Sequence, residues 1–163
     1  MTSGLVIAVL IGVIVISIGF ASYMYLLYQP NFIEVQAGEP IQVGPVKYIV
    51  GQEGEHSGNK DNRPEGTFFK IRITAENLKS ETTRMTGGQF FLLDESDKKY
   101  QAVYGKFSEE DLLTDILEPN VPVTWTTQFD IPYDEQEKYR IGILPTKIQS
   151  SNDIGIVCVQ NCN

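Results

Sequence analysis

The sequence predicts an all-β protein, a β-sandwich preceded by one N-terminal transmembrane α-helix. Three observations carry this prediction. Residues Gly4 to Tyr28 form a run of 25 residues without a charged side chain. After it, short segments of alternating polar and apolar residues recur between turn-forming residues. The remaining part, about 130 residues, is long enough for one domain with its own core.

The apolar run is long enough to cross a membrane. As a helix it would measure about 37 Å, against roughly 30 Å of hydrocarbon. Its 14 Leu, Ile, Val and Phe residues contribute about −6 kcal/mol to insertion, and Gln29-Pro30 ends the helix. We therefore divide the chain into a tail over residues 1–3, a transmembrane helix over 4–28, a tether over 29–40 and a domain over 41–163.

A cleaved secretory signal is the alternative to an anchor, since Gly19-Phe20-Ala21 looks like a small-residue cleavage site. However, residues 1–3 carry no Lys or Arg, and the apolar run is longer than a signal requires. The downstream flank carries Glu34 and Glu39 before the first cation, Lys47. Since cations mark the cytoplasmic side, we expect a single-pass protein of the cell membrane, with a cytoplasmic N-terminus and an extracytoplasmic domain.

Three small residues in the apolar run share one helix face. Gly4, Ala8 and Gly12 follow one another at intervals of four. Such a stripe lets two transmembrane helices approach closely, so it predicts helix packing in the membrane, although ordinary lipid-facing composition explains it equally well. The expected partners are the bilayer and other membrane or envelope proteins.

Strand patterns follow along the domain. Thr67–Ala75 alternates between apolar and polar residues, as a half-buried strand does. Val121–Ile131, with Trp125 on its inward face, and Tyr139–Ile143 repeat this pattern. The wholly apolar Phe90–Leu93 predicts a central strand. We expect Tyr100–Tyr104 to pair with it across a polar turn, and the remaining strands to be Ile41–Val50, interrupted at Gly44-Pro45, and Ile154–Val159.

Two segments do not read as strands. Gly51–Gly66 has no apolar period and predicts a long mobile loop. Ser108 followed by three acids is typical of a helix start, and an apolar face over Leu112–Leu117 then predicts a two-turn helix ending at Pro119. With seven or eight short strands, the domain is predicted to be immunoglobulin-like.

The chain also resembles a known family. The quoted motifs are Gly66–Asn77 (GTFFKIRITAEN), Phe90–Asp94 with Lys99-Tyr100, Leu117–Pro119 and Phe129–Pro132. Their order resembles uncharacterised, telokin-like and immunoglobulin-like extracellular domains on anchored proteins and lipoproteins of bacteria and archaea. The chain departs from the family at Pro119-Asn120, where a proline-glycine turn is usual. The resemblance implies a sandwich outside the membrane and contact with other proteins, and it implies no catalytic residues.

The charge is strongly acidic. Asp and Glu number 21 against 13 Lys and Arg, a net charge of −8. This excess argues against nucleic acid and against a folded face bound to anionic lipid. A solvated acidic surface explains the charge, and cationic partners or divalent ions are the open alternatives.

Two cysteines, Cys158 and Cys162, form a C-x3-C pair near the end of the sequence. Outside the cytoplasm such a pair tends to oxidise, so we predict a structural disulfide, which requires a turn between the two residues. Free or intermolecular thiols are the alternative. The spacing argues against a redox C-x2-C motif.

No catalytic or metal motif stands out. His56 is the single histidine, which is too few for a mononuclear copper site, and no base–nucleophile arrangement is evident. Oxygen ligands for calcium occur in two groups, Asp94, Glu95 and Asp97, and Glu53, Glu55 and Asp61. Neither group matches an EF-hand. We predict no enzyme and no cofactor.

The sequence therefore predicts a single-pass, membrane-anchored, extracytoplasmic interaction protein, an accessory subunit that docks on a larger membrane or envelope complex. A pilin-like filament subunit is one alternative, because pilins also join an apolar N-terminal helix to a β-rich domain. A small-ligand or calcium-binding domain is another.

Overall fold

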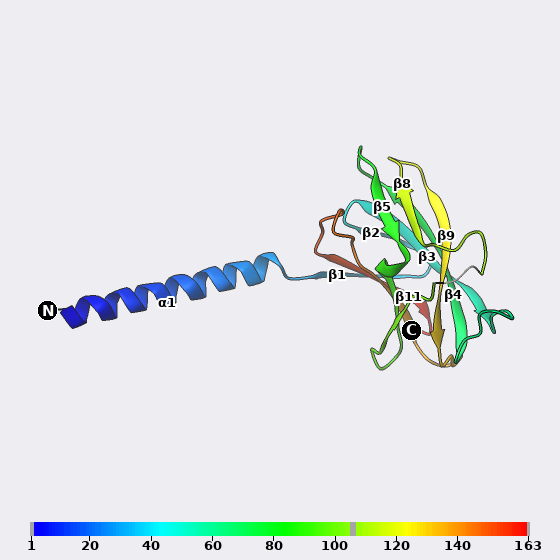
Figure 1. Ribbon diagram of the computed structural model, residues 1–163, viewed down its shortest axis with the longest axis horizontal. Helices are drawn as coiled ribbons and strands as arrows, with labels where there is room; N and C mark the ends of the chain where they lie inside the picture. Colours follow the sequence, from blue (N-terminus) through cyan, green and yellow to red (C-terminus); the bar gives the residue numbers. More distant parts are fainter. Residues whose placement is uncertain (1, 105–106, 163) are drawn as a thin grey trace. The chain divides into compact units, whose positions relative to one another are not determined.

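The computed structural model describes residues 2–104 and 107–162 and divides the chain into two units, residues 1–30 and 31–163. The first unit is the helix α1 (Thr2–Leu27), which carries no acidic residue in its first turn and no basic residue in its last (Figure 1). Its segment Val6–Leu27 is long and apolar enough to cross a membrane. Thr2 and Ser3, predicted as a tail, belong to the helix, and Met1 lies outside the described residues.

The second unit is a sandwich of two main sheets. The first sheet has the order β1 (Asn31–Gln36), β11 (Asp153–Gln160), β10 (Tyr139–Ile143), β6 (Phe90–Leu93) and β7 (Lys99–Gln101). The second has the order β2 (Pro40–Val43), β3 (Val46–His56), β4 (Thr67–Asn77) and β9 (Val123–Ile131). A short pair, β5 (Thr83–Thr86) and β8 (Thr114–Leu117), lies beside them. The predicted all-β sandwich with one N-terminal apolar helix is confirmed.

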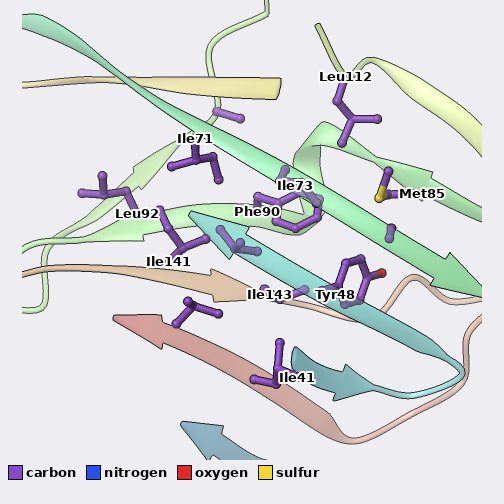
Figure 2. Packing of buried hydrophobic residues seen from close by; sticks show 14 of the residues in the cluster. Ile41, Tyr48, Ile71, Ile73, Met85, Phe90, Leu92, Leu112, Ile141 and Ile143 are labelled. Carbon is purple, nitrogen blue, oxygen red and sulfur yellow. The ribbon is translucent and has the colours of Figure 1, made fainter. Parts of the chain in front are cut away.

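The core lies between the two main sheets, as Figure 2 shows for Ile71 of β4, Leu92 of β6 and Ile141 of β10. On β4 the residues Ile71, Ile73 and Ala75 are fully buried, while Arg72 between them is exposed. Each buried Ile or Leu contributes about 1.5–3 kcal/mol relative to exposure. The period of two in the sequence therefore selects the face of the sheet that packs on its neighbour.

A buried polar network closes one end of the sandwich. Gln89 Nε2 donates to Leu144 O (2.8 Å) and to Gln149 Oε1 (3.0 Å), and Gln149 Nε2 donates to Arg84 O (3.1 Å). Gln149 Nε2 also lies 3.4 Å from the Tyr48 hydroxyl. Burial raises the pKa of Tyr48 to about 12, so the hydroxyl stays neutral inside the core. The network fastens the loop after β10 to the second sheet.

The tether predicted over residues 29–40 differs from the structure, because Asn31–Gln36 is strand β1. It pairs in parallel with β11, from Asn31 beside Asp153 to Gln36 beside Cys158. Ile33 and Val35 pack against the core, and this packing stabilises the strand. The domain therefore begins at about residue 31, and Tyr28–Pro30 alone separate it from α1.

The two-turn helix predicted over 108–117 is wrong. Ser108 does not cap a following helix; instead the Asp111 carboxylate accepts hydrogen bonds from the amides of Phe107 (2.6 Å) and Ser108 (2.9 Å). Thr114–Leu117 then pairs with β5 as strand β8. Pairing between strands outweighs the local helix pattern here, and Asp115 on β8 accepts a hydrogen bond from the indole of the half-buried Trp125 (2.8 Å).

The loop predicted over Gly51–Gly66 is shorter in the structure. Strand β3 continues to His56 through an irregularity between Gln52 and Gly54, where Gly54 adopts φ +139°. In the loop between β3 and β4, the Asn59 side chain accepts hydrogen bonds from the amides of Asp61 and Asn62, as in an Asx-turn. The interruption predicted at Gly44-Pro45 is the turn between β2 and β3.

Candidate functional site

The edge of β1 is the candidate site. The amide of Asn31, at the start of β1, donates to Asn152 O just before β11 (2.9 Å). The amide of Ala37, just after β1, donates to Cys158 O in β11 (2.8 Å). Odd-numbered residues thus turn their backbone groups inward, and Phe32, Glu34 and Gln36 turn theirs away from the sheet. Among the described residues, strand β1 pairs with β11 alone, so this outer edge has no described strand beside it.

Other edges of the sandwich are shorter or covered. Strand β7 has three residues and β2 has four, the first of them Pro40, which has no amide proton. Strand β9 is long, but a covering segment (residues 102–104 and 107–112) lies along it. Leu112 N donates to Thr126 O (2.8 Å), and Thr126 N donates to Glu110 O (2.8 Å). Among the outermost strands in the part of the chain that the structure describes, β1 is therefore the longest open one, and the end of β3 beyond β2, residues 51–56, also has no strand on one side.

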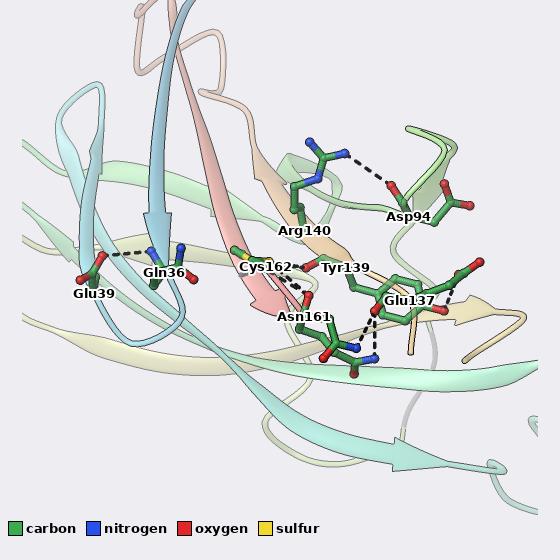
Figure 3. The surroundings of a disulfide bond; sticks show 10 residues. Gln36, Glu39, Asp94, Glu137, Tyr139, Arg140, Asn161 and Cys162 are labelled. Atoms are coloured by element: carbon green, nitrogen blue, oxygen red, sulfur yellow. Dashed lines mark hydrogen bonds between the residues drawn. A yellow bond between two sulfur atoms is a disulfide. The ribbon is translucent and has the colours of Figure 1, made fainter. Parts of the chain in front are cut away.

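A groove of about 220 Å³ lies beside β1. Its lining combines β1 and the following turn with β11, the disulfide and β10: Glu34, Val35, Gln36, Glu39, Lys138, Arg140, Ile156, Cys158 and Cys162. Acidic groups come from the β1 side and basic groups from the β10 side. Glu39 Oε2 also accepts the outward amide of Gln36 (3.0 Å) (Figure 3), so the free edge ends at Gln36.

The predicted disulfide between Cys158 and Cys162 is present, with 6.0 Å between the two Cα atoms. The chain turns between them at Asn161, which adopts φ +50°. Asn161 Nδ2 donates to Glu137 O (3.1 Å; Figure 3) and to Glu135 O (2.6 Å). These bonds tie the closed loop to the turn before β10. The disulfide therefore stiffens the end of the strand on which β1 lies.

Strand β10 is held to the β6–β7 turn by Arg140. Its guanidinium pairs with the Asp97 carboxylate and lies 3.4 Å from Asp94 O. Partial burial acts to raise the pKa of Asp94, but hydrogen bonds from Ser96, Lys98 and Tyr100 outweigh it and hold the pKa below its usual value. Asp94 thus orders the β6–β7 turn, and Asp97 links this turn to β10.

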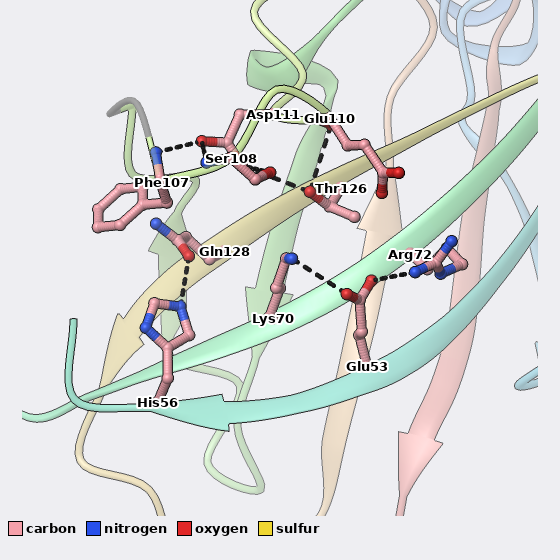
Figure 4. A network of polar contacts seen from close by, with 10 residues as sticks. All are labelled: Glu53, His56, Lys70, Arg72, Phe107, Ser108, Glu110, Asp111, Thr126 and Gln128. Carbon is pink, nitrogen blue, oxygen red and sulfur yellow. Dashed lines mark hydrogen bonds and ion pairs between the residues drawn. The ribbon is translucent and has the colours of Figure 1, made fainter. Parts of the chain in front are cut away.

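A second polar cluster covers the outer face of the second sheet (Figure 4). Glu53 lies between Lys70 (3.0 Å) and Arg72 (3.2 Å). His56 Nδ1 accepts the Gly58 amide (3.1 Å), so Nε2 carries the proton that is shared with Gln128 Oε1 (2.7 Å). These contacts join β3, β4 and β9. Both ring nitrogens of His56 are used in them, so the histidine has a structural role.

The carboxylates considered for calcium are placed separately. Asp97 pairs with Arg140 and Glu53 with two cations, as described above. In residues 2–104 and 107–162, no three His, Cys, Asp or Glu side chains converge as a metal site requires.

The stripe of Gly4, Ala8 and Gly12 lies along one side of α1, and a Cβ added at either glycine would meet open space. Among residues 2–104 and 107–162, α1 is the only α-helix, so the use of this stripe stays a prediction.

Sequence reasoning named Glu34 and Glu39 only as charges flanking the apolar run and missed the edge that they mark. The pattern Ile33-Glu34-Val35-Gln36 alternates between half-buried and exposed positions, and this alternation is the feature that would have identified a strand.

Solved structures define the class to which this fold belongs. The yjhA protein from Bacillus subtilis matches with a TM-score of 0.62 at 18% identity, over 77% of this chain and 98% of that one. The secreted protein MPT63 from Mycobacterium tuberculosis matches with a TM-score of 0.58 at 10% identity, over 77% and 97%. The ycdA protein from Bacillus subtilis, described as a lipoprotein, matches with a TM-score of 0.59 at 12% identity, over 76% of this chain and 39% of that one. The fold is thus an MPT63-like β-sandwich, shared with secreted proteins and lipoproteins.

Sequence comparison then places the chain in a family. Residues 35–153 match the family described as a domain of unknown function, DUF4352, and the chain belongs to this family. No curated protein matches it in sequence. The predicted resemblance to uncharacterised β-sandwich domains of secreted and lipoprotein type is confirmed at this level.

Proposed function

We propose that this chain is a membrane-anchored, extracytoplasmic protein-binding module whose β1 edge receives an extended segment of a partner protein. The single observation behind the proposal is the open edge of β1, which turns the backbone groups of Phe32 and Glu34 outward. An extended peptide can add to such an edge by main-chain hydrogen bonds, with side-chain pockets supplying selectivity.

The anchor is the second part of the proposal. The helix α1 meets the length and composition needed for a span, and an uncleaved helix would hold the open edge near other membrane proteins. The domain would then serve as an accessory subunit of a membrane or envelope complex, with neither a catalytic step nor a cofactor of its own.

Photo-crosslinking tests the docking edge. A benzophenone amino acid replaces Phe32, which is 60% exposed, and in a second protein it replaces Tyr104, which is 58% exposed and lies in the covering segment. Irradiation of intact membranes should yield one adduct of defined mass from position 32 and none from position 104. Equal adducts at both positions, or none at position 32, would overturn the edge as the docking site.

Membrane extraction and N-terminal sequencing test the anchor. An anchored chain stays in the membrane after an alkaline carbonate wash and keeps its N-terminal helix. A released domain that starts near residue 22 would identify a cleaved signal, and a filament fraction enriched in the chain would favour the pilin-like alternative.

A further inference from the structure

The geometry points to the chemistry of the partner. We infer that the extended segment bound at β1 carries one apolar and one basic side chain two residues apart, facing Phe32 and Glu34. This inference rests on the proposed function, because it specifies the partner of the same edge.

The spacing follows from the strand. Phe32 and Glu34 lie on the outward-facing side of β1, while Ile33 and Val35 between them pack against the core. A strand that pairs with this edge brings its side chains to about 5 Å from the residues directly opposite. Successive residues of the partner point to opposite faces, so the two that meet Phe32 and Glu34 are two positions apart.

The length of the contact is limited at both ends. The Gln36 amide already donates to the Glu39 carboxylate (3.0 Å). At the other end, Pro30 precedes the strand and has no amide proton. Backbone pairing is therefore confined to Phe32 and Glu34, and the recognised segment is short.

The charge follows from Glu34. Its side chain is exposed, and none of the ion pairs found among the described residues uses it. The basic groups of the groove belong to Lys138 and Arg140, at β10 or just before it, two strand spacings further in. The Arg140 guanidinium is already paired with Asp97, and the axis of β10 lies three strand spacings, about 14 Å, from that of an added strand. The adjacent Glu34 therefore dominates the local field and favours a cation.

The same carboxylate disfavours a second copy of this chain. Two β1 edges that pair antiparallel about Ile33, the middle of the outward-facing pair, place Glu34 of each copy opposite Phe32 of the other. Neither carboxylate then meets a cation, and two edges of the same charge repel one another, as charged edge residues commonly do in β-proteins. The occupant is therefore a different polypeptide, with the complementary charge.

Charge-swapped peptides test the inference on the full chain in nanodiscs of phosphatidylcholine, which carries no net charge. The probes are Thr-Thr-Val-Thr-Lys-Thr-Thr and its counterpart with Glu in place of Lys, both blocked at the ends. The readout is protection of the Phe32 and Glu34 amides from hydrogen exchange, titrated with peptide. We expect the Lys peptide to bind about 3–10-fold more tightly than the Glu peptide.

The variant Glu34→Lys should reverse this preference, and Glu109→Lys, which makes the same change of net charge in the covering segment, should leave it unaltered. Equal binding of both peptides, or a Lys preference that survives in Glu34→Lys, would overturn the charge rule. Crosslinking at position 32 separates the two proposals. If Glu34→Lys still captures the cellular partner undiminished, edge docking stands and the charge rule fails; if the wild-type chain captures nothing there, the proposed function fails.

Discussion

Strands β9 and β1 are both outer strands of the sandwich, but their free edges differ. The covering segment hydrogen-bonds along β9, and Leu112 from that segment is buried, with 3% of its surface exposed. No segment that the structure describes covers strand β1 in this way, and Phe32 at its outer face is 60% exposed. Since an uncovered edge invites pairing with other chains, the domain protects one edge with its own chain and leaves the other available.

The largest effect is expected where the cover of β9 is broken. Leu112→Asp places a carboxylate in the core and should lower the free energy of unfolding by about 3–4 kcal/mol. The neighbouring variant Leu113→Asp is the matched control, because Leu113 is 54% exposed, and should change stability by less than about 0.5 kcal/mol. Urea unfolding measures both variants. Equal losses of stability would contradict the conclusion that Leu112 is packed in the core while Leu113 is not.

A smaller effect is expected from the disulfide that stiffens β11 beside the open edge. Replacing both cysteines, Cys158→Ser with Cys162→Ser, should lower the free energy of unfolding by about 2 kcal/mol, because the closed loop is short. Reduction of the wild-type protein should reproduce this loss in urea unfolding. Wild-type stability that is the same with and without reductant would contradict a stabilising role.

Acid should loosen the start of β1, where the Asp153 carboxylate holds Asn31 and Gly44. Hydrogen bonds from Asn31 and Ser151 lower the pKa of Asp153 below the ordinary 3.8, against the opposing effect of partial burial. A lowered folded-state pKa means that this stabilisation is complete above pH 3.8 and is lost as the pH falls through the folded-state value. Hydrogen exchange at β1 should therefore rise below about pH 4, and Asp153→Asn should remove this pH dependence.

The smallest effect on stability is expected at the edge itself. Glu34→Lys alters an exposed side chain and should change the free energy of unfolding by less than about 0.5 kcal/mol, although it is expected to reverse the peptide preference. Thermal and urea unfolding check the first statement. A large loss of stability would show that Glu34 stabilises β1 within the folded chain, and would contradict its assignment as a free group for binding a partner.

The sequence predicted those strands whose pattern is local. Thr67–Ala75 and Tyr139–Ile143 carry their alternation within one segment, and both are core strands. Strand β1 escaped prediction although Ile33-Glu34-Val35-Gln36 alternates, because this run is short and its pairing with β11, 122 residues away from Asn31 to Asp153, is not encoded locally. Its sequence also follows Pro30 directly, which suggested a linker.

The helix predicted at 108–117 failed for the opposite reason. Its N-cap pattern is local and clear, but Asp111 turns back to bind the amides before it, and Leu117 is buried in a strand. The disulfide was predictable because C-x3-C spacing suffices for a turn. The candidate site was not predictable as a site, since an open edge is defined by which strands are absent beside it.

The parallel pairing of β1 with β11 has a mechanical consequence. Any force that reaches the domain through residue 30 enters by β1. A pull along the direction of that strand loads all six register pairs with β11 at once, in shear. A hairpin pulled from its open end would instead lose its hydrogen bonds one after another. The first strand of this domain therefore resists a force that is applied through the residues before it.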